Sequence, residues 1–360
     1  MAENTTLRIL KIIGSPFVEG QGSDLPESRN EVIDLFRYAT KNKIGLLYLE
    51  TLKKRGKLER FGLESEYQRE CEKHDEHLLT ARRVSKLFNA HNIDYAIFKS
   101  TMPYPAVPND VDVIHFGSDK EFKKTVEIML NAGYERIEDV SSPVEFEVHD
   151  ARHSHHIGSH TKDVYDIDFY RKVAANYIPY LNKGKLAKYT AETNVLGEGV
   201  KILQPEADLI AIIAHSLVEQ LCTLFVYYAT IYYLAEMGSN GVSNLLRLAG
   251  DHNVTVATRA HCSVVAALHQ SAHGFTPGVL EQILTKLGGS EKKEVRNLFK
   301  RDFKMPHRYN WPTVIRALLE RIRDGEFRAG ALRLAMSLLN PKFLRYIIWQ
   351  LAWRHRRETY

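Results

Sequence analysis

Two short segments decide the fold, YAIFKS at residues 95–100 and DVDVIHF at residues 110–116. The first is a short apolar run that ends in Lys-Ser, a pattern typical of a buried strand. In the second, apolar and polar residues alternate, as they do in a strand with one face in the core. Three prolines lie between the two segments, and no helix can cross them. The sequence therefore predicts two strands joined by an irregular loop.

The chain that follows these segments continues the strand-rich pattern. Ser118-Asp119 begins a helix with apolar residues at helical spacing, and Gly133 ends it. Further strands are expected at residues 134–140, 144–148 and 163–170, where β-branched and aromatic residues recur. We interpret residues 93–200 as a compact core of mixed helices and strands inside an otherwise helical protein.

The flanking regions are predicted to be helical. Residues 1–92 form an N-terminal helical region that includes a long helix over residues 64–90. Pro205-Glu206 is a good helix start, and it opens a C-terminal helical domain over residues 201–340. Residues 341–360 are expected to form a basic aromatic terminal helix. The predicted fold class is α+β, with a small mixed β-sheet between N-terminal helices and a C-terminal helical domain.

Composition excludes several protein classes. Of the 360 residues, 44% are hydrophobic and 26% are charged, which is ordinary for a folded globular protein and excludes wholesale disorder. Three scattered cysteines are too few for a disulfide framework or a cysteine zinc cluster. The N-terminal residues lack a signal-peptide pattern, and no apolar run reaches the length of a membrane-spanning helix. We therefore expect a cytoplasmic protein.

Four aspartates are the best candidates for chemistry. Asp110 and Asp112 are two apart on a predicted strand, so their side chains leave the same face. Asp166 and Asp168 have the same relation on a later strand. If the two strands are neighbours, three or four carboxylates converge, and oxygen ligands of this kind suit Mg²⁺ or Mn²⁺. The alternative is that these acids serve only the solubility of a surface strand.

In this region the chain resembles the nucleotidyltransferase superfamily related to DNA polymerase β. The closest likeness is to a poorly characterised branch of standalone nucleotidyltransferases in bacteria and archaea. The shared features, in order, are a strand ending at Lys99-Ser100, a Tyr-Pro element, the Asp-x-Asp pair, a helix closed by Gly-Tyr, a strand with a further acidic residue, and a Pro-Glu helix start followed by a His. The resemblance covers most of the chain.

The resemblance implies roles for particular residues. Asp110, Asp112 and Asp168 would bind Mg²⁺ or Mn²⁺, and Asp166 or Asp168 would assist deprotonation of the acceptor hydroxyl. The loop at Ser100 would hold the triphosphate, with Lys99 as a positive partner. The adjoining residues Thr101 and Asn109 complete the nucleotide-binding candidates. The implied reaction moves a nucleoside monophosphate from an NTP to an acceptor hydroxyl or phosphate, with release of pyrophosphate. A small metabolite, a protein or an RNA fits as acceptor.

The phosphate loop departs from the family pattern. The superfamily carries Gly-Ser or Gly-Gly there and the branch Lys-Gly, whereas this chain has no glycine between residues 93 and 116. Glycine lets backbone approach phosphate closely. A second hypothesis is therefore a catalytically degenerate nucleotidyltransferase fold that acts as a nucleotide-, RNA- or membrane-binding module.

The last fifth of the chain is basic. Residues 291–360 contain 17 Lys and Arg against 7 Asp and Glu, whereas the rest of the chain is mildly acidic. This imbalance favours an anionic partner, either RNA or a lipid surface. Residues 343–357 are aromatic and basic and too short to span a bilayer, which suits peripheral membrane contact. A solvated helical face is the alternative.

Histidines form the remaining candidates. Five of them occur between His149 and His160, where a zinc site and a polar loop over the sheet are both open interpretations. His215 lies among apolar residues of a predicted helix, and we interpret it as a core residue without chemistry.

Overall fold

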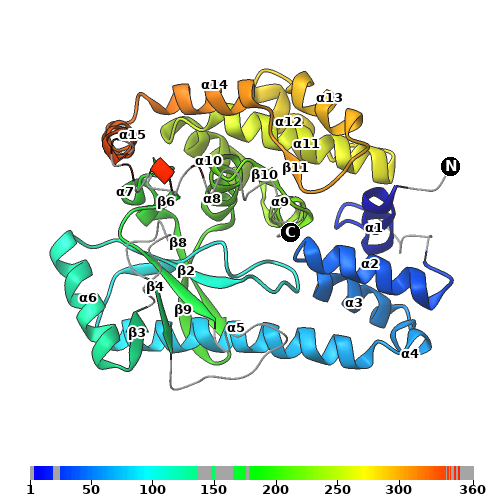
Figure 1. Ribbon diagram of the computed structural model, residues 1–360, viewed down its shortest axis with the longest axis horizontal. Helices are drawn as coiled ribbons and strands as arrows, with labels where there is room; N and C mark the ends of the chain where they lie inside the picture. Colours follow the sequence, from blue (N-terminus) through cyan, green and yellow to red (C-terminus); the bar gives the residue numbers. More distant parts are fainter. Residues whose placement is uncertain are drawn as a thin grey trace.

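The computed structural model describes residues 4–18, 25–136, 147–150, 165–175 and 178–337, with residues 339, 341, 344, 345 and 348. Within these residues the fold is a mixed β-sheet with helices on both faces, so the predicted α+β class is confirmed (Figure 1). The histidine-rich segment 151–160 and most of the predicted terminal helix at 341–360 lie outside the described residues.

The main sheet has seven described strands in the order β3-β4-β5-β2-β1-β9-β8. Two neighbouring pairs are parallel, β2 with β5 and β1 with β9, and the other pairs are antiparallel. The strands are β1 (Tyr95–Ile97), β2 (Asp110–His115), β3 (Tyr134–Arg136), β4 (Glu147–Asp150), β5 (Asp166–Tyr170), β8 (Thr190–Val195) and β9 (Glu198–Leu203).

The strands predicted at residues 95–98, 110–116 and 163–170 correspond to β1, β2 and β5. Those predicted at 134–140 and 144–148 overlap β3 and β4, and the residues between β3 and β4 lie outside the description. The β8–β9 hairpin was not predicted. It belongs to the sheet, which therefore continues to Leu203 through the pairing of β9 with β1.

One face of the sheet is covered by α5 (Glu64–Ala90) and α6 (Asp119–Asn131). Ser118 begins α6 with a capping box, in which its hydroxyl accepts from the Glu121 amide and the Glu121 carboxylate accepts from the Ser118 amide. Apolar residues of both helices pack with alternate residues of the central strands into a separate core. We call this side of the sheet the dry face.

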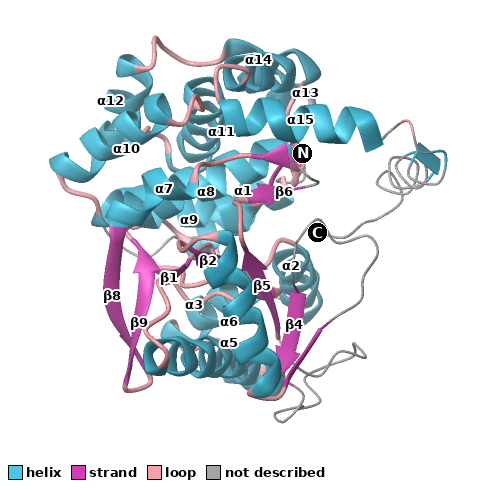
Figure 2. Ribbon diagram, turned by 90° about the vertical axis from the view of Figure 1, so that its left-hand side faces the viewer, coloured by secondary structure: helices cyan, strands magenta, loops and turns pink. Residues whose placement is uncertain are grey.

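The other face is covered by a larger helical body made from both ends of the chain (Figure 2). In Figure 1 the C-terminal helices of this body lie on one side of the sheet and α5 on the other, whereas its N-terminal helices lie beside the sheet, near one end of α5. Its helices are α1 (Thr5–Ile13), α2 (Arg29–Lys41), α3 (Gly45–Lys54), α4 (Leu58–Phe61), α7 (Lys183–Leu186), α8 (Pro205–Val218), α9 (Leu224–Glu236), α10 (Ser239–Asp251), α11 (Thr255–His273), α12 (Gly278–Lys286), α13 (Lys292–Lys300), α14 (Trp311–Arg321) and α15 (Gly325–Ser337).

The N-terminal and C-terminal helices of this body share one hydrophobic core. Polar contacts join them as well. The Ser15 hydroxyl lies 2.8 Å from Nε2 of His269 in α11. The backbone carbonyl of Asn42 accepts from the Phe225 amide of α9 at 3.2 Å, and the Asn42 side chain accepts from the Leu224 amide at 3.4 Å. The two ends of the chain are therefore packed as one body.

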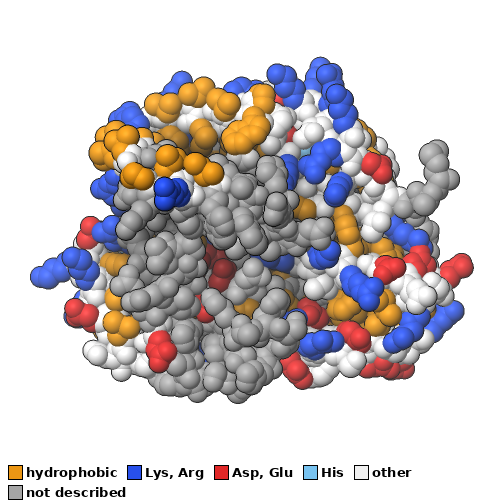
Figure 3. Space-filling model, in the orientation of Figure 1, with side chains coloured by type: hydrophobic (Ala, Val, Ile, Leu, Met, Phe, Trp, Pro, Cys, Tyr) orange, Lys and Arg blue, Asp and Glu red, His pale blue; other side chains and the backbone are white. Residues whose placement is uncertain are grey.

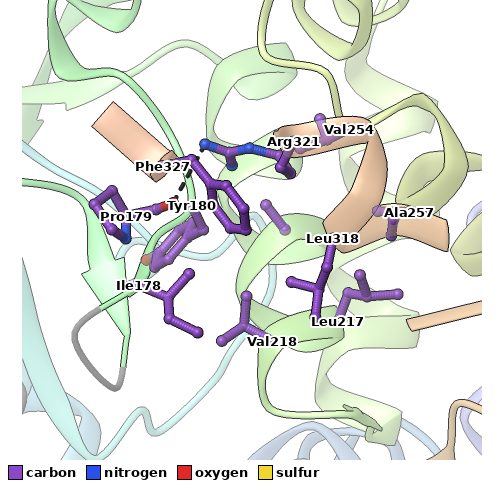
Figure 4. A pocket seen from close by; sticks show the side chains of 12 residues that line it. Ile178, Pro179, Tyr180, Leu217, Val218, Val254, Ala257, Leu318, Arg321 and Phe327 are labelled. Carbon is purple, nitrogen blue, oxygen red and sulfur yellow. Dashed lines mark hydrogen bonds between the residues drawn. The ribbon is translucent and has the colours of Figure 1, made fainter. Parts of the chain in front are cut away.

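Two short ladders brace the helical body. They are β6 (Ala174–Ala175) with β7 (Ile178–Pro179), and β10 (Leu221–Cys222) with β11 (His307–Arg308). Figure 4 shows an apolar pocket beside β7, where the Arg321 guanidinium donates to the Pro179 carbonyl at 3.2 Å and Phe327 of α15 packs nearby. This contact holds α15 against the body. Among the described helices, none combines the length and apolar character needed to cross a membrane.

Candidate active site

Three of the predicted carboxylates lie together on the face of the sheet opposite α5. Strands β2 and β5 are parallel neighbours, and their register places Asp110 beside Asp166 and Asp112 beside Asp168. Asp110, Asp112 and Asp168 line a cavity of about 200 Å³ that opens to solvent, and Asn109 lines it too. Asp166 is half-buried and does not line this cavity. The sequence left both Asp166 and Asp168 open as the residue that assists deprotonation. In the structure only Asp168 of the two lines the cavity.

Lys99 enters the cavity from the end of β1. Its φ of +55° is in the left-handed region, which is uncommon for a residue with a side chain. The Lys99 amide donates to Oδ1 of the buried Asp208 in α8 at 2.7 Å, and this bond holds the turn in place. The Asp208 carboxylate also accepts from the Tyr233 hydroxyl at 2.5 Å. Burial raises the pKa of Asp208 to about 6, against the effect of these two donors.

The Lys99 side chain forms a buried ion pair with the second aspartate of the Asp-x-Asp motif. Its Nζ lies 3.0 Å from Oδ1 of Asp112, and 4.7 Å and 5.4 Å from the ring centres of Phe98 and Tyr170. Burial would lower the pKa of the ammonium, but Asp112, Tyr180 and Asp110 together outweigh burial and raise it. Burial raises the pKa of Asp112 to about 6, against the opposing effect of Lys99. At neutral pH the pair is therefore ionic.

Ser100 and Thr101 do not line the cavity. The Ser100 hydroxyl is buried, donates to the Phe98 carbonyl at 3.0 Å and accepts from the Asp112 amide at 2.9 Å. It therefore ties the end of β1 to the strand that carries the carboxylates. The Thr101 carbonyl lies 3.2 Å from the Tyr233 hydroxyl. Among the predicted nucleotide-binding residues, Lys99 and Asn109 reach the cavity.

The opposite wall of the cavity was not predicted from the sequence. It is formed by Lys43, by His215 and Glu219 near the end of α8, and by the start of α9. His215 and Ser216 of α8 and Glu219, which follows it, line the cavity at a spacing that places them on one side of the helix. This helical spacing of polar residues was the available signal. The interpretation of His215 as a core residue was wrong, because it is half-buried and forms part of the cavity wall.

Charges from both walls act on one another. Burial lowers the pKa of the Lys43 ammonium, while Asp110 and Asp112 oppose this effect. Burial lowers the pKa of His215 well below its usual value of 6.5, and Lys99 and Lys43 lower it further. His215 is therefore neutral at physiological pH. The cavity combines carboxylates on the sheet with ammonium groups from Lys43 and Lys99.

The carboxylates on the sheet are ligands of the kind that divalent cations prefer. Asp110, Asp112 and Asp168 offer carboxylate oxygens, which Mg²⁺ and Mn²⁺ prefer. As the described side chains stand, however, no three His, Cys, Asp or Glu residues converge closely enough to hold a metal ion. Lys99 engages one of the Asp112 oxygens that a metal would need. A cation bound to that oxygen would therefore have to replace the ammonium at Asp112.

Comparisons with known proteins add a distant neighbour. No family model matches the chain, and no curated protein matches it. Among solved structures, the chain is similar to an antigenic nucleotidyltransferase-like protein from Paracoccidioides brasiliensis, at 14% identity and a TM-score of 0.33. The match covers 49% of this chain and 90% of that protein. At this TM-score the likeness carries no weight for the function, which we base on the cavity itself.

Proposed function

We propose that the protein is a metal-dependent nucleotidyltransferase that moves a nucleoside monophosphate from an NTP to an acceptor hydroxyl or phosphate. The observation that carries this proposal is the placement of Asp110, Asp112 and Asp168 on one cavity wall, on adjacent parallel strands. Lys43 and Lys99 bring positive charge to the same space.

The reaction assigns a task to each side chain. For a hydroxyl acceptor, its oxygen forms a bond to the α-phosphorus, the bond from that phosphorus to the bridging oxygen breaks, and pyrophosphate leaves. Asp168 takes the proton of the acceptor hydroxyl. Asp110, Asp112 and Asp168 would hold Mg²⁺ or Mn²⁺, which would neutralise triphosphate charge and polarise the α-phosphoryl group. Once displaced from Asp112, the Lys99 ammonium is available to a phosphate oxygen.

The test is transfer of label from α-labelled NTPs, with Mg²⁺ or Mn²⁺, into RNA, protein and small-molecule fractions of a cell extract. We expect Asp168→Asn to lower the transfer rate about 10²- to 10⁴-fold, because the variant lacks the proton acceptor. Asp166→Asn is the matched control on the same strand, and it should keep most of the rate. Equal loss in both variants would contradict the assignment, and so would transfer that survives Asp110→Asn combined with Asp112→Asn.

A second candidate function is a non-catalytic module on the same fold. It is favoured by the phosphate loop, because the Lys99 amide and the Ser100 hydroxyl are both engaged within the protein. This candidate predicts no transfer of label, and no increase in thermal stability when an NTP and Mg²⁺ are added together. An increase in stability without transfer would identify a nucleotide-binding protein.

A further inference from the structure

A cationic surface lies on α13 and on the segment that leads from it to β11. The exposed cations of this fully described stretch, residues 291–308, are Lys292, Lys293, Arg296, Lys300, Lys304 and Arg308. We call this set the basic face. In Figure 3 Lys and Arg side chains gather over α13, whereas hydrophobic side chains gather over α14 and α15.

Acidic residues of the same stretch do not neutralise the basic face. Glu291 is buried and bonds to Arg259 at 3.2 Å and Arg316 at 3.0 Å. Glu294 is fully buried and accepts from His307 at 3.0 Å and from the Asn310 amide at 3.1 Å. Within residues 291–308, Asp302 is the one acid that stays exposed, and Asn4 donates to its carboxylate at 3.1 Å. The net field of this surface is therefore positive.

An exposed aromatic ring stands among these cations. Phe299 is 52% exposed, and its ring meets that of Phe303 edge to face at a centroid distance of 5.1 Å. Phe299 lines a shallow surface hollow of about 400 Å³, together with Lys292, Arg296 and Lys300. Cations alone are common on a solvated helix. A ring exposed between cations is the combination that binds single-stranded nucleic acid, through phosphate contacts and base stacking.

The basic face ends at Arg308, next to a residue of the cavity wall. Arg308 of β11 is in register with Leu221 of β10, and Leu221 lines the cavity that contains the carboxylates. The Asn297 side chain of α13 donates to the Arg308 carbonyl at 3.0 Å, so α13 and β11 are fixed to each other. A strand that follows the cations from α13 to Arg308 arrives beside the cavity wall.

We propose that the basic face binds single-stranded nucleic acid and that the end of this strand is the acceptor. The role of the strand end as acceptor rests on the proposed function, whereas binding to the basic face does not. A lipid surface is the less fitting partner here, because the exposed apolar side chains concentrate on α14 and α15 and not on α13.

Binding is measured by fluorescence anisotropy with labelled single-stranded RNA and DNA oligonucleotides of mixed sequence, at several salt concentrations. The protein carries Asp110→Asn and Asp112→Asn, so binding is separated from catalysis. We expect the triple variant Lys292→Glu, Arg296→Glu, Lys300→Glu to lose at least about tenfold in affinity. It should also reduce the slope of log K against log salt by about 2, because each lost phosphate contact contributes about 0.7.

Phe299→Ala sharpens the test. It should lower affinity between about fivefold and a hundredfold through lost stacking, and leave the salt slope unchanged because no charge is removed. The matched control reverses three exposed lysines of α6, Lys120, Lys123 and Lys124, which make the same charge change on the dry-face side of the sheet. This control should bind as the parent protein does.

Equal losses in the α6 and α13 variants would overturn the basic face as the binding site. So would absence of oligonucleotide binding together with binding to vesicles of phosphatidylcholine and phosphatidylserine. Binding through the basic face without transfer of label to any oligonucleotide by the unmutated protein would uphold the surface and refute the acceptor clause.

Discussion

The two faces of the β2–β5 pair carry side chains of opposite character. Successive residues of each strand point alternately to one face and to the other. On the dry face, Val111, Val113, Ile167 and Phe169 are fully buried under α5 and α6. On the other face, Asp110, Asp112 and Asp168 line the cavity at positions where apolar residues would give a more stable sheet. The comparison teaches that the dry face stabilises the sheet, whereas the cavity face keeps carboxylates at a cost in stability. Four positions test this division: Phe169 and His115 on the dry face, Asp112 on the cavity face, and Ser100, whose hydroxyl bonds to the Asp112 amide.

The largest effect is expected on the dry face at Phe169. Its ring stacks on Phe122 at a centroid distance of 4.8 Å and packs against Phe88 at 5.5 Å. Phe169→Ala should lower the free energy of unfolding by about 3–5 kcal/mol because it leaves a cavity in a closed core. Urea denaturation measures this loss. The control on the opposite face, Tyr170→Phe, keeps the ring and should cost far less, and a similar loss in both variants would erase the distinction between the faces.

The next effect concerns acid stability at His115, also on the dry face. Burial, with the Lys183 ammonium nearby, lowers the pKa of His115 to about 4 from the usual 6.5. The pKa of His115 is lower in the folded protein than in the unfolded chain, so protonation of this residue favours unfolding. The folded state is therefore most stable above pH 6.5 and loses stability as the pH falls toward 4. The loss reaches about 3 kcal/mol at most. His115→Leu should flatten the stability profile in this window relative to the unmodified protein, and an unchanged profile would contradict the pKa shift.

A somewhat smaller effect is expected from the ion pair on the cavity face. Asp112→Leu leaves the Lys99 ammonium without its buried partner, which should cost about 2–3 kcal/mol. The cost falls below that of a fully enclosed pair because the cavity admits water. Adding Lys99→Met should restore most of the lost stability, as measured by a double-mutant cycle. A double variant as unstable as the single one would mean that Lys99 is held by other partners.

The smallest effect is expected at Ser100. Ser100→Ala removes the oxygen that accepts from the buried Asp112 amide, and an unsatisfied donor of this kind costs about 1–2 kcal/mol. Thr101→Ala is the neighbouring control, because the recorded hydrogen bond of Thr101 uses its carbonyl. Thermal unfolding measures stability, and equilibrium titration measures NTP affinity. A loss of NTP affinity at unchanged stability would return Ser100 to the phosphate-binding role that the family resemblance implied.

The strands β2 and β5 and their aspartates could be predicted from the sequence, because the pattern that indicates them lies within short continuous segments. Alternation along residues 110–116 and 166–170 indicates both the strands and the shared side of the aspartates. The β8–β9 hairpin was not predicted, because β8 is a mostly polar edge strand and only one of its six residues is buried. Alternation is a weak signal where one side of a strand is not packed.

The opposite cavity wall was not predictable in this way. Lys43 and Glu219 come from segments far apart in the sequence, and no spacing rule relates either residue to the aspartates. His215 was misjudged because buried neighbours surround it along α8, and the short polar spacing that it shares with Ser216 and Glu219 was the only local signal that this side faces a cavity. Tertiary packing alone brings these residues together.

The contact between Asn42 and α9 has a consequence for how the protein is made. Asn42 and Leu224 are 182 positions apart, and their hydrogen bond helps to join the two ends of the chain beside the cavity. A nascent chain that has emerged through Leu203 possesses every strand of the main sheet, but not the α8–α9 wall. Its carboxylates would face water without a binding site. The cavity is therefore completed only after α9 has been synthesised and has packed against Asn42.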